Sequence, residues 1–111
     1  MELGLTSFAD VRPDPGTGEM VDAGERLRNV VDEIVKAEEV GLDAYGLGEH
    51  HRPDMAASAP AVTLAAAAAR TERIRLGSAV IVLSSADPVR TFQDFSTLDQ
   101  LARGRAELMV G

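Results

Sequence analysis

Hydrophobic residues in this chain follow two alternating patterns, short continuous runs and longer stretches with helical spacing. In the longer stretches, apolar positions recur every three or four residues, which predicts three amphipathic helices. The short runs are the length of buried strands. The expected order is therefore β-α-β-α-β-α-β, with four strands at residues 3–8, 44–48, 74–83 and 106–111.

Start and stop signals bound the first two helices. Asp22 and Glu25 have the spacing of a capping box, and Gly41 is a natural stop for the first helix. The second helix is expected at residues 58–71, with Ser58 or a neighbour as its cap and a proline in its first turn.

The third helix is expected to begin at Asp87-Pro88, a cap followed by a first-turn proline, and to end at Gly104. Arg90 lies in its first turn, where the helix dipole disfavours a cation. A specific partner such as a nearby carboxylate or a backbone carbonyl is therefore expected, with a structural salt bridge favoured over a catalytic role. The helical spacing predicts that this helix buries Phe92, Phe95, Leu98, Leu101 and Ala102.

The unit spacing indicates the fold class. Residues 79–83 are continuously apolar, which favours a parallel strand covered on both faces. Successive units are about thirty residues apart, so eight would need roughly 250 residues, the size of a (β/α)₈ barrel. We expect residues 1–111 to form one α/β domain, the first half of such a TIM-type barrel. Two explanations stay open: a fragment of a longer protein, or a half-barrel whose open edges pair with another chain.

Composition excludes several classes of function. The net charge of −7 disfavours nucleic acid and anionic membrane surfaces as partners. The absence of cysteine excludes disulfides and thiolate metal sites. No signal peptide is visible at the amino terminus, and the longest apolar run is too short to span a bilayer. A cytoplasmic protein is expected.

The second strand leads directly into Gly48-Glu49-His50-His51, which holds the only two histidines of the chain. Active sites of β/α proteins are built at the carboxyl ends of strands, and histidine moves protons near neutral pH. Adjacent strand residues point to opposite faces, so only one histidine is expected to face a site there. Consecutive residues rarely converge on one ion, and no further ligand is at hand, so no metal site is predicted.

Four segments together resemble the bacterial luciferase-like flavin-dependent oxidoreductases, across essentially the whole chain. They are Gly48-Glu49-His50-His51, the run at residues 76–83, Asp87-Pro88-Val89-Arg90, and residues 98–101 continued through Gly104-Arg105. Each segment is weak alone, but their order and spacing are specific. The resemblance implies a (β/α)₈ barrel that binds reduced FMN, or in some branches a deazaflavin, at the carboxyl ends of its strands.

The resemblance also assigns site residues. His50 matches the active-site histidine, and Glu49 either orients a histidine or contacts the flavin. His51 is expected to be structural, paired with a carboxylate or carbonyl. The Ala79-Val80 bond matches a bond that is often cis in this family and packs against the flavin ring. Thr6, Ser7 and Phe8 end the first strand on the same rim and are expected to line the substrate side.

These assignments imply a monooxygenase that uses reduced FMN and dioxygen on a small organic substrate, with a flavin reductase supplying the reduced flavin. Two alternatives stay open: deazaflavin-dependent hydride transfer on the same fold, and a non-catalytic half-barrel assembly module. In the family, phosphate ligands come from positions beyond Gly111, so this chain alone is expected to hold flavin weakly. The resemblance further implies a homo-oligomer formed through the second and third helices.

Overall fold

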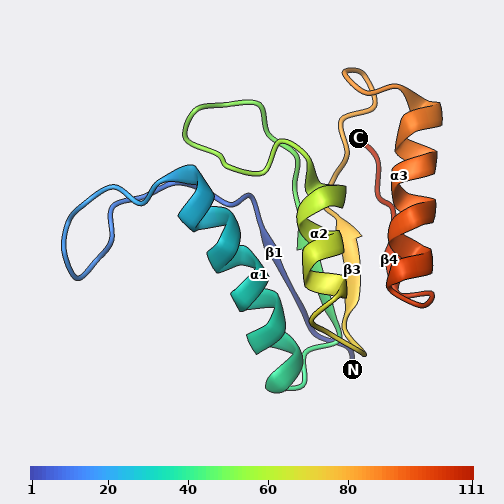
Figure 1. Ribbon diagram of the computed structural model, residues 1–111, viewed down its shortest axis with the longest axis horizontal. Helices are drawn as coiled ribbons and strands as arrows, with labels where there is room; N and C mark the ends of the chain where they lie inside the picture. The colour runs from blue at the N-terminus through green and yellow to red at the C-terminus, as the bar shows by residue number, and fades with distance from the viewer.

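The computed structural model describes residues 1–111, and its elements follow the predicted order (Figure 1). The sheet is parallel throughout, with its four strands in sequence order, so the strand–helix alternation predicted from the sequence is confirmed. None of the helices combines the length and apolarity needed to cross a membrane. The strands are β1 (Gly4–Ser7), β2 (Ala44–Leu47), β3 (Arg75–Ser78) and β4 (Ala106–Glu107); the helices are α1 (Ala23–Glu39), α2 (Pro60–Ala68) and α3 (Pro88–Leu101).

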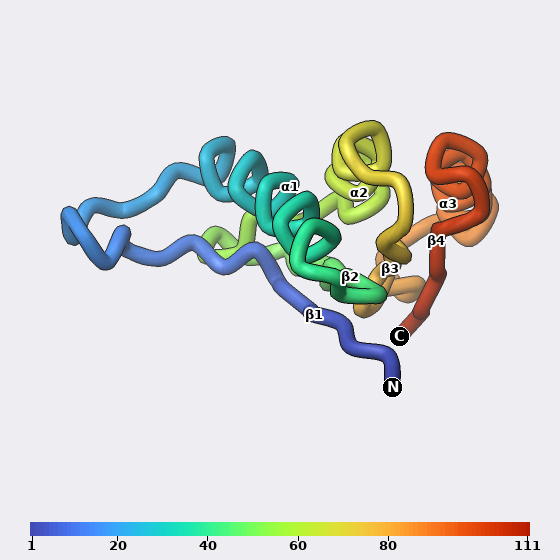
Figure 2. Tube along the Cα trace, turned by 90° about the horizontal axis from the view of Figure 1, so that it is seen from below, coloured from blue at the N-terminus to red at the C-terminus, as the bar shows by residue number.

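All three helices lie on one side of the sheet, and no element covers the other side (Figure 2). We call these the covered face and the open face. Successive side chains of a strand point to opposite faces of the sheet. Residues paired across neighbouring strands therefore lie on the same face. One row of aligned residues on the covered face is Leu5, Tyr45, Leu76 and Ala106, and the next row on the open face is Thr6, Gly46, Gly77 and Glu107.

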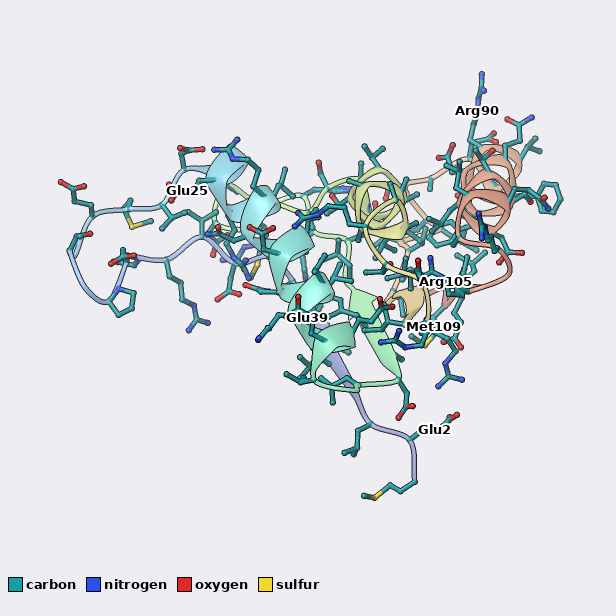
Figure 3. The ribbon with its side chains drawn as sticks, turned by 60° about the horizontal axis from the view of Figure 1, so that its bottom comes forward. Glu2, Glu25, Glu39, Arg90, Arg105 and Met109 are labelled. Carbon is teal, nitrogen blue, oxygen red and sulfur yellow. The ribbon has the colours of Figure 1, made fainter.

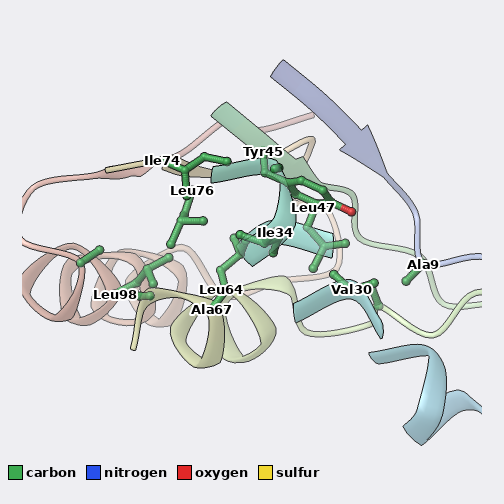
Figure 4. Packing of buried hydrophobic residues seen from close by; sticks show 14 of the residues in the cluster. Ala9, Val30, Ile34, Tyr45, Leu47, Leu64, Ala67, Ile74, Leu76 and Leu98 are labelled. Carbon is green, nitrogen blue, oxygen red and sulfur yellow. The ribbon is translucent and has the colours of Figure 1, made fainter. Parts of the chain in front are cut away.

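The core lies between the covered face and the helices (Figure 4). Leu47 and Leu76 point from the sheet toward the helices and are fully buried. Ile34 of α1 and Leu64 of α2 meet them from the helix side, also fully buried. Burying large apolar side chains here is the main stabilising contribution to the fold.

The three predicted helix starts are confirmed, two of them with a side-chain cap. The Asp22 side chain accepts a hydrogen bond from the Glu25 backbone N–H at 2.9 Å, and Asp87 caps α3 in the same way through Arg90. For α2 the cap is Ala59, the neighbour of Ser58, and Pro60 lies in the first turn as expected, although no side chain makes a cap bond there. The helix is also shorter than the expected range of 58–71, since it begins at Pro60 and ends at Ala68.

The expected buried side of α3 is only partly correct. Phe95, Leu98 and Ala102 are buried, but Phe92 is 69% exposed and Leu101 is 61% exposed. Helical spacing marks a wide apolar stripe, and here only its centre meets the sheet and α2, because α3 is the last helix of the row. Arg90 extends away from the body of the protein (Figure 3) and contacts the Gln93 side chain, not a carboxylate.

The third strand is shorter than its apolar run. Regular pairing ends at Ser78, the Ala79–Val80 bond is cis, and one further bridge joins Ile81 to Val110. The expectation of a strand covered on both faces through residue 83 is therefore wrong. Only Ile81 of the last residues is buried, while Val80 and Leu83 reach solvent because the open face has no covering layer.

At the end of the sheet opposite the histidines, two charged side chains, Glu38 and Arg105, bind backbone groups of the loops. One oxygen of the Glu38 carboxylate accepts backbone N–H groups of Arg73 and Ile74, at 2.6 and 2.8 Å. Arg105, next to β4 (Figure 3), donates to the backbone carbonyls of Ala102 and Ile74 and to the Thr71 hydroxyl. Both charged groups therefore serve the fold by satisfying backbone groups of the loops there.

Candidate functional site

The carboxyl ends of the first three strands bring the predicted site residues to one rim of the sheet. β2 leads into His50, β1 into Phe8, and β3 into Ala79. The rim is held by backbone bonds across neighbouring strands. Gly48 donates to the Ser7 carbonyl and Ala79 donates to the Leu47 carbonyl, both at 2.9 Å. The side chains beyond the strand ends are thus set on a rigid edge.

His50 lies half-buried at this rim, with its backbone fixed and its ring available. Its N–H donates to the Ala57 carbonyl at 3.0 Å. The imidazole ring meets the Phe8 ring edge to face, with centroids 4.7 Å apart and planes at 75°. Such a contact orients a ring without occupying its nitrogens. The histidine that takes part in an ion pair is His51, not His50.

Glu49 and His51 lie on the other side of the strand from His50. The Glu49 side chain is only 7% exposed and lines a cavity of about 170 Å³ between the amino-terminal ends of α2 and α3. His51 Nε2 is 2.6 Å from Glu49 Oε1, which confirms the expected pairing of His51 with a carboxylate. Glu49 Oε2 accepts the Val82 N–H at 2.9 Å. Both carboxylate oxygens therefore have partners within this chain, away from the open face.

Glycines at the end of β2 shape the open face beside His50. A Cβ at Gly46 would lie 2.9 Å from the Ala79 Cβ and 3.2 Å from Thr6 Cγ2. A Cβ at Gly48 would collide with the Phe8 ring and lie 2.9 Å from the Ala79 carbonyl oxygen. Only glycine at these two positions lets Thr6, Phe8 and Ala79 pack directly against the β2 backbone. The surface beside His50 therefore consists of short and flat groups.

The structure separates the three residues predicted for the substrate side. Thr6 and Phe8 lie on the open face, next to Gly46 and Gly48. Ser7 lies on the covered face, where its hydroxyl accepts the Ala9 N–H at 3.0 Å and contacts Arg26 at 3.4 Å. The period-two alternation of a strand accounts for this separation.

Two cationic side chains near the rim, Arg52 and Arg12, are already paired with carboxylates. Arg52 makes two bonds to the Asp54 carboxylate, at 2.8 and 2.9 Å, and Arg12 pairs with Asp10. The hydrogen bond from Arg52 lowers the pKa of the Asp54 carboxyl below its ordinary value. The rim therefore offers little to bind the phosphate of a nucleotide.

A larger hollow than the one beside Glu49 lies at the opposite end of the sheet. It measures about 580 Å³ and is lined by Arg70, Arg103 and Arg105 among others. Arg105 is engaged with backbone carbonyls, and Arg70 pairs with Asp32 at 2.7 Å. Because Arg70 and Arg105 have internal partners, and active sites of parallel α/β folds lie at the carboxyl ends of strands, we place the site at the rim.

Two contributors to the rim were missed by sequence reasoning. The buried Ser78 hydroxyl donates to the Met109 carbonyl at 2.7 Å and accepts the Met109 N–H at 2.9 Å, joining β3 to the chain after β4. The Val82 N–H, bound by Glu49, is the other. A serine inside an apolar run was the available signal for Ser78, whereas a backbone group carries no sequence signal.

These residues fit a flavin ring but not its phosphate. The open face beside His50 presents Ala79, half-exposed Val80 and the edge of Phe8, with close glycine packing beneath. A flat, largely apolar ring requires such a surface. The His50 imidazole lies at the border of this surface, against Phe8. No group of three or more potential metal ligands converges anywhere in the chain.

Known proteins share both the sequence pattern and the fold. N-acetyl-S-alkylcysteine monooxygenase of Bacillus subtilis is 38% identical over 95 residues, which are 85% of this chain and 28% of that protein. The oxygenating constituent of 3,6-diketocamphane monooxygenase from Pseudomonas putida, solved in complex with FMN, superimposes with a TM-score of 0.88 at 26% identity, over 100% of this chain and 29% of that one.

A more distant structure shares the fold alone. The coenzyme F420 dependent tetrahydromethanopterin reductase of Methanopyrus kandleri superimposes with a TM-score of 0.75 at 22% identity, over 99% of this chain and 26% of that one. The chain thus spans less than a third of the length of each of these three proteins. The family model described as luciferase-like monooxygenase matches residues 1–111, and this chain therefore belongs to the luciferase-like monooxygenase family.

Proposed function

We propose that this chain supplies the flavin-facing half of an FMN-dependent monooxygenase acting on a small organic substrate with dioxygen. The observation that carries the proposal is the open face at the rim, where His50 borders a flat surface made by Ala79, Val80 and Phe8. The FMN complex of the structurally similar diketocamphane monooxygenase supports FMN as the cofactor. The proposal assigns residues 1–111 to one half-barrel domain and places the activity in the whole protein.

Each residue on the open face has a distinct task in this proposal. Ala79 and Val80 support one side of the flavin ring, while Thr6 and Phe8 border the substrate. His50 holds or releases a proton at a ring nitrogen, oriented by its contact with Phe8. When bound, reduced FMN supplies the electrons for dioxygen chemistry. The aromatic and aliphatic groups around His50 limit access of water to the reacting atoms.

Two alternatives to an FMN-dependent monooxygenase differ from it in the cofactor that they would bind. Deazaflavin-dependent hydride transfer is supported only by proteins that share the fold at 20% and 22% identity, so FMN is favoured. A non-catalytic half-barrel module, assembled through its strand edges, would bind neither cofactor. The edges that such assembly would use are β1 and β4, each with one neighbouring strand.

Partners follow from the surface and from the chemistry. We propose a homo-oligomer through α2 and α3, which expose the apolar side chains of Val62, Val89 and Phe92. A flavin reductase that delivers reduced FMN, and a cytoplasmic location, complete the proposal. The α2 face that carries Leu64 and Ala67 is already buried against the core, so only its outer side is available.

The proposal is tested by titrating this chain with FMN and, separately, with the deazaflavin, while light scattering follows its oligomeric state. Binding of FMN in preference to the deazaflavin supports the monooxygenase. The reverse preference would establish the hydride-transfer alternative. Because this chain alone is expected to hold flavin weakly, the titration extends to millimolar cofactor. Binding of neither cofactor in that range by a well-folded oligomer would contradict the proposal and favour the assembly module. His50→Gln is the matched variant: FMN affinity should stay within about threefold, because the proton carrier borders the ring and does not support it.

A further inference from the structure

We propose that Glu49 is a positioning residue that fastens the segment Val80–Val82 to the end of β2, with His51 as the second anchor of its carboxylate. This inference rests on the proposed function, since that segment carries the surface on which the flavin ring would lie. It differs from the expectation that Glu49 contacts the flavin. The Glu49 side chain is on the covered face, so it acts on the open face only through the backbone.

The first step of the argument is the pair of bonds that Glu49 makes to one short segment. Its backbone N–H donates to the Val80 carbonyl at 3.1 Å. Its Oε2 accepts the Val82 N–H at 2.9 Å. One residue thus holds both peptide groups that flank Ile81, from the β2 side.

The second step is what fixes the other side of the segment. Ile81 donates to the Met109 carbonyl at 2.9 Å and accepts the Gly111 N–H at 3.0 Å. Its side chain is buried under α3. Regular strand pairing has ended at Ser78, so Val80–Val82 has no continuous ladder to hold it. Without the Glu49 carboxylate, Val82 would lose its bond toward β2, and the segment would depend chiefly on the chain after β4.

The third step concerns the partners of the Glu49 carboxylate. The Glu49 side chain is almost fully buried, and a buried carboxylate needs partners for both of its oxygens. Val82 occupies one oxygen and His51 Nε2 occupies the other. His51 is half-exposed, so it links the buried carboxylate to solvent. The two adjacent histidines therefore have different roles. His50 lies on the open face, whereas His51 holds the Glu49 carboxylate, which in turn positions the segment Val80–Val82.

The experiment compares amide hydrogen exchange and FMN affinity in Glu49→Ala, Glu49→Gln and His51→Ala. Exchange at Val82 should accelerate about tenfold or more in Glu49→Ala, beyond any change at the α1 amides, and FMN affinity should fall about fivefold or more. Glu49→Gln should restore both to within about threefold, because its amide oxygen still accepts the Val82 N–H. His51→Ala should lie between the two.

Glu38→Ala is the matched control, since Glu38 is also a carboxylate that accepts backbone N–H groups, at the other end of the sheet. It should accelerate exchange at Ile74 and leave Val82 and FMN affinity unchanged. A purely structural role for Glu49 would instead accelerate all amides alike. Should Glu49→Ala fail to fold, Glu49→Gln and His51→Ala carry the same comparison.

Several outcomes would overturn the inference. Unchanged Val82 exchange in Glu49→Ala would show that the carboxylate does not hold the segment. Lost Val82 protection with unchanged FMN affinity would show that the segment does not shape the flavin surface. If the unmodified chain binds no FMN, the proposed function fails, whereas the fastening of Val80–Val82 is still decided by Val82 exchange alone.

Discussion

The two faces of this sheet are built from opposite kinds of residues. The covered face presents Tyr45, Leu47 and Leu76, all buried against helices. The aligned positions on the open face include Gly46 and Gly77, and the face ends at Gly48 and Ala79. Both sets come from β2, β3 and the residues that directly follow them, in strict alternation. Large side chains on one face provide the stability, and their absence from the other leaves room for a flat ligand.

This difference teaches how a short chain combines a stable core with an uncovered binding surface. Covered-face residues should govern the free energy of unfolding, and open-face residues should govern ligand affinity. Substitutions chosen on each face test that separation. Their expected effects on stability range from several kcal/mol in the core to almost nothing on the outer side of α3.

The largest effect is expected for Leu47→Ala on the covered face. Leu47 is fully buried, and truncating such a leucine leaves a cavity that costs about 2–5 kcal/mol. Urea denaturation followed by circular dichroism measures the change. Thr6→Ala, one position away in register on the open face, should change stability by less than about 0.5 kcal/mol. Equal costs for the two variants would show that the faces do not differ as described.

The next effect is expected for Gly48→Ala. The new Cβ would strike the Phe8 ring and the Ala79 carbonyl oxygen, so both must shift, at a cost of about 1–3 kcal/mol. FMN affinity should fall about tenfold, because the ring surface and the Phe8–His50 contact are both disturbed.

Gly77→Ala is the matched control, because its Cβ would meet only Glu107, at 3.4 Å from the Glu107 Cβ, an ordinary contact. It should keep FMN affinity within about twofold. Similar losses in both variants would indicate a general intolerance of the sheet instead of a specific surface at Gly48.

A smaller effect concerns pH and Glu38 at the far end of the sheet. Partial burial raises the pKa of this carboxyl, but the N–H groups of Ile74, Arg73 and Glu72 outweigh it, and the pKa is lowered below the ordinary 4.5. A carboxyl with a lowered folded-state pKa stabilises the fold above its unfolded pKa and loses that contribution as the pH falls through the folded value. Stability should therefore decline below about pH 4.5, and Glu38→Gln should flatten that decline.

Denaturation curves from pH 6 to pH 3 measure the decline, roughly spanning the ordinary carboxyl range. Glu25→Gln is the control, on the exposed first turn of α1. The same pH dependence in Glu38→Gln and the unmodified chain would show that other carboxyl groups cause the loss.

The smallest effect is expected for Arg90→Ala. Arg90 extends from α3 into solvent, and its side chain contacts only Gln93, at 3.3 Å. Surface changes of this kind stay within about 0.5 kcal/mol. A loss above about 1 kcal/mol would reveal a role in assembly, which size-exclusion chromatography of the variant would show.

The sequence predicted the order of elements and the two helix caps at Asp22 and Asp87, because periodicity and capping are local signals. It predicted that His50 and His51 face opposite ways, since strand alternation is also local. It could not predict the end of β3 at Ser78, because an apolar run looks alike inside and outside a ladder. The exposed Phe92 was missed for a related reason, as burial depends on which elements happen to lie beside α3.

At the candidate site, the sequence indicated which residues lie at the strand ends, but it could not indicate which groups they bind. The pairing of Glu49 with the Val82 N–H joins positions far apart in sequence and involves a backbone group. The placement of Ser7 on the covered face follows from register, which the sequence leaves unspecified until the strand is paired.

The central claim is that the open face at the rim binds the flavin ring, and nitrogen-15 NMR of this chain titrated with FMN tests it most directly. The account predicts progressive shifts of the amides around His50, Ala79 and Val80, with the amides near Glu38 at the far end of the sheet unmoved. No shifts with FMN in the millimolar range, or shifts centred on the hollow lined by Arg70 and Arg103, would contradict it.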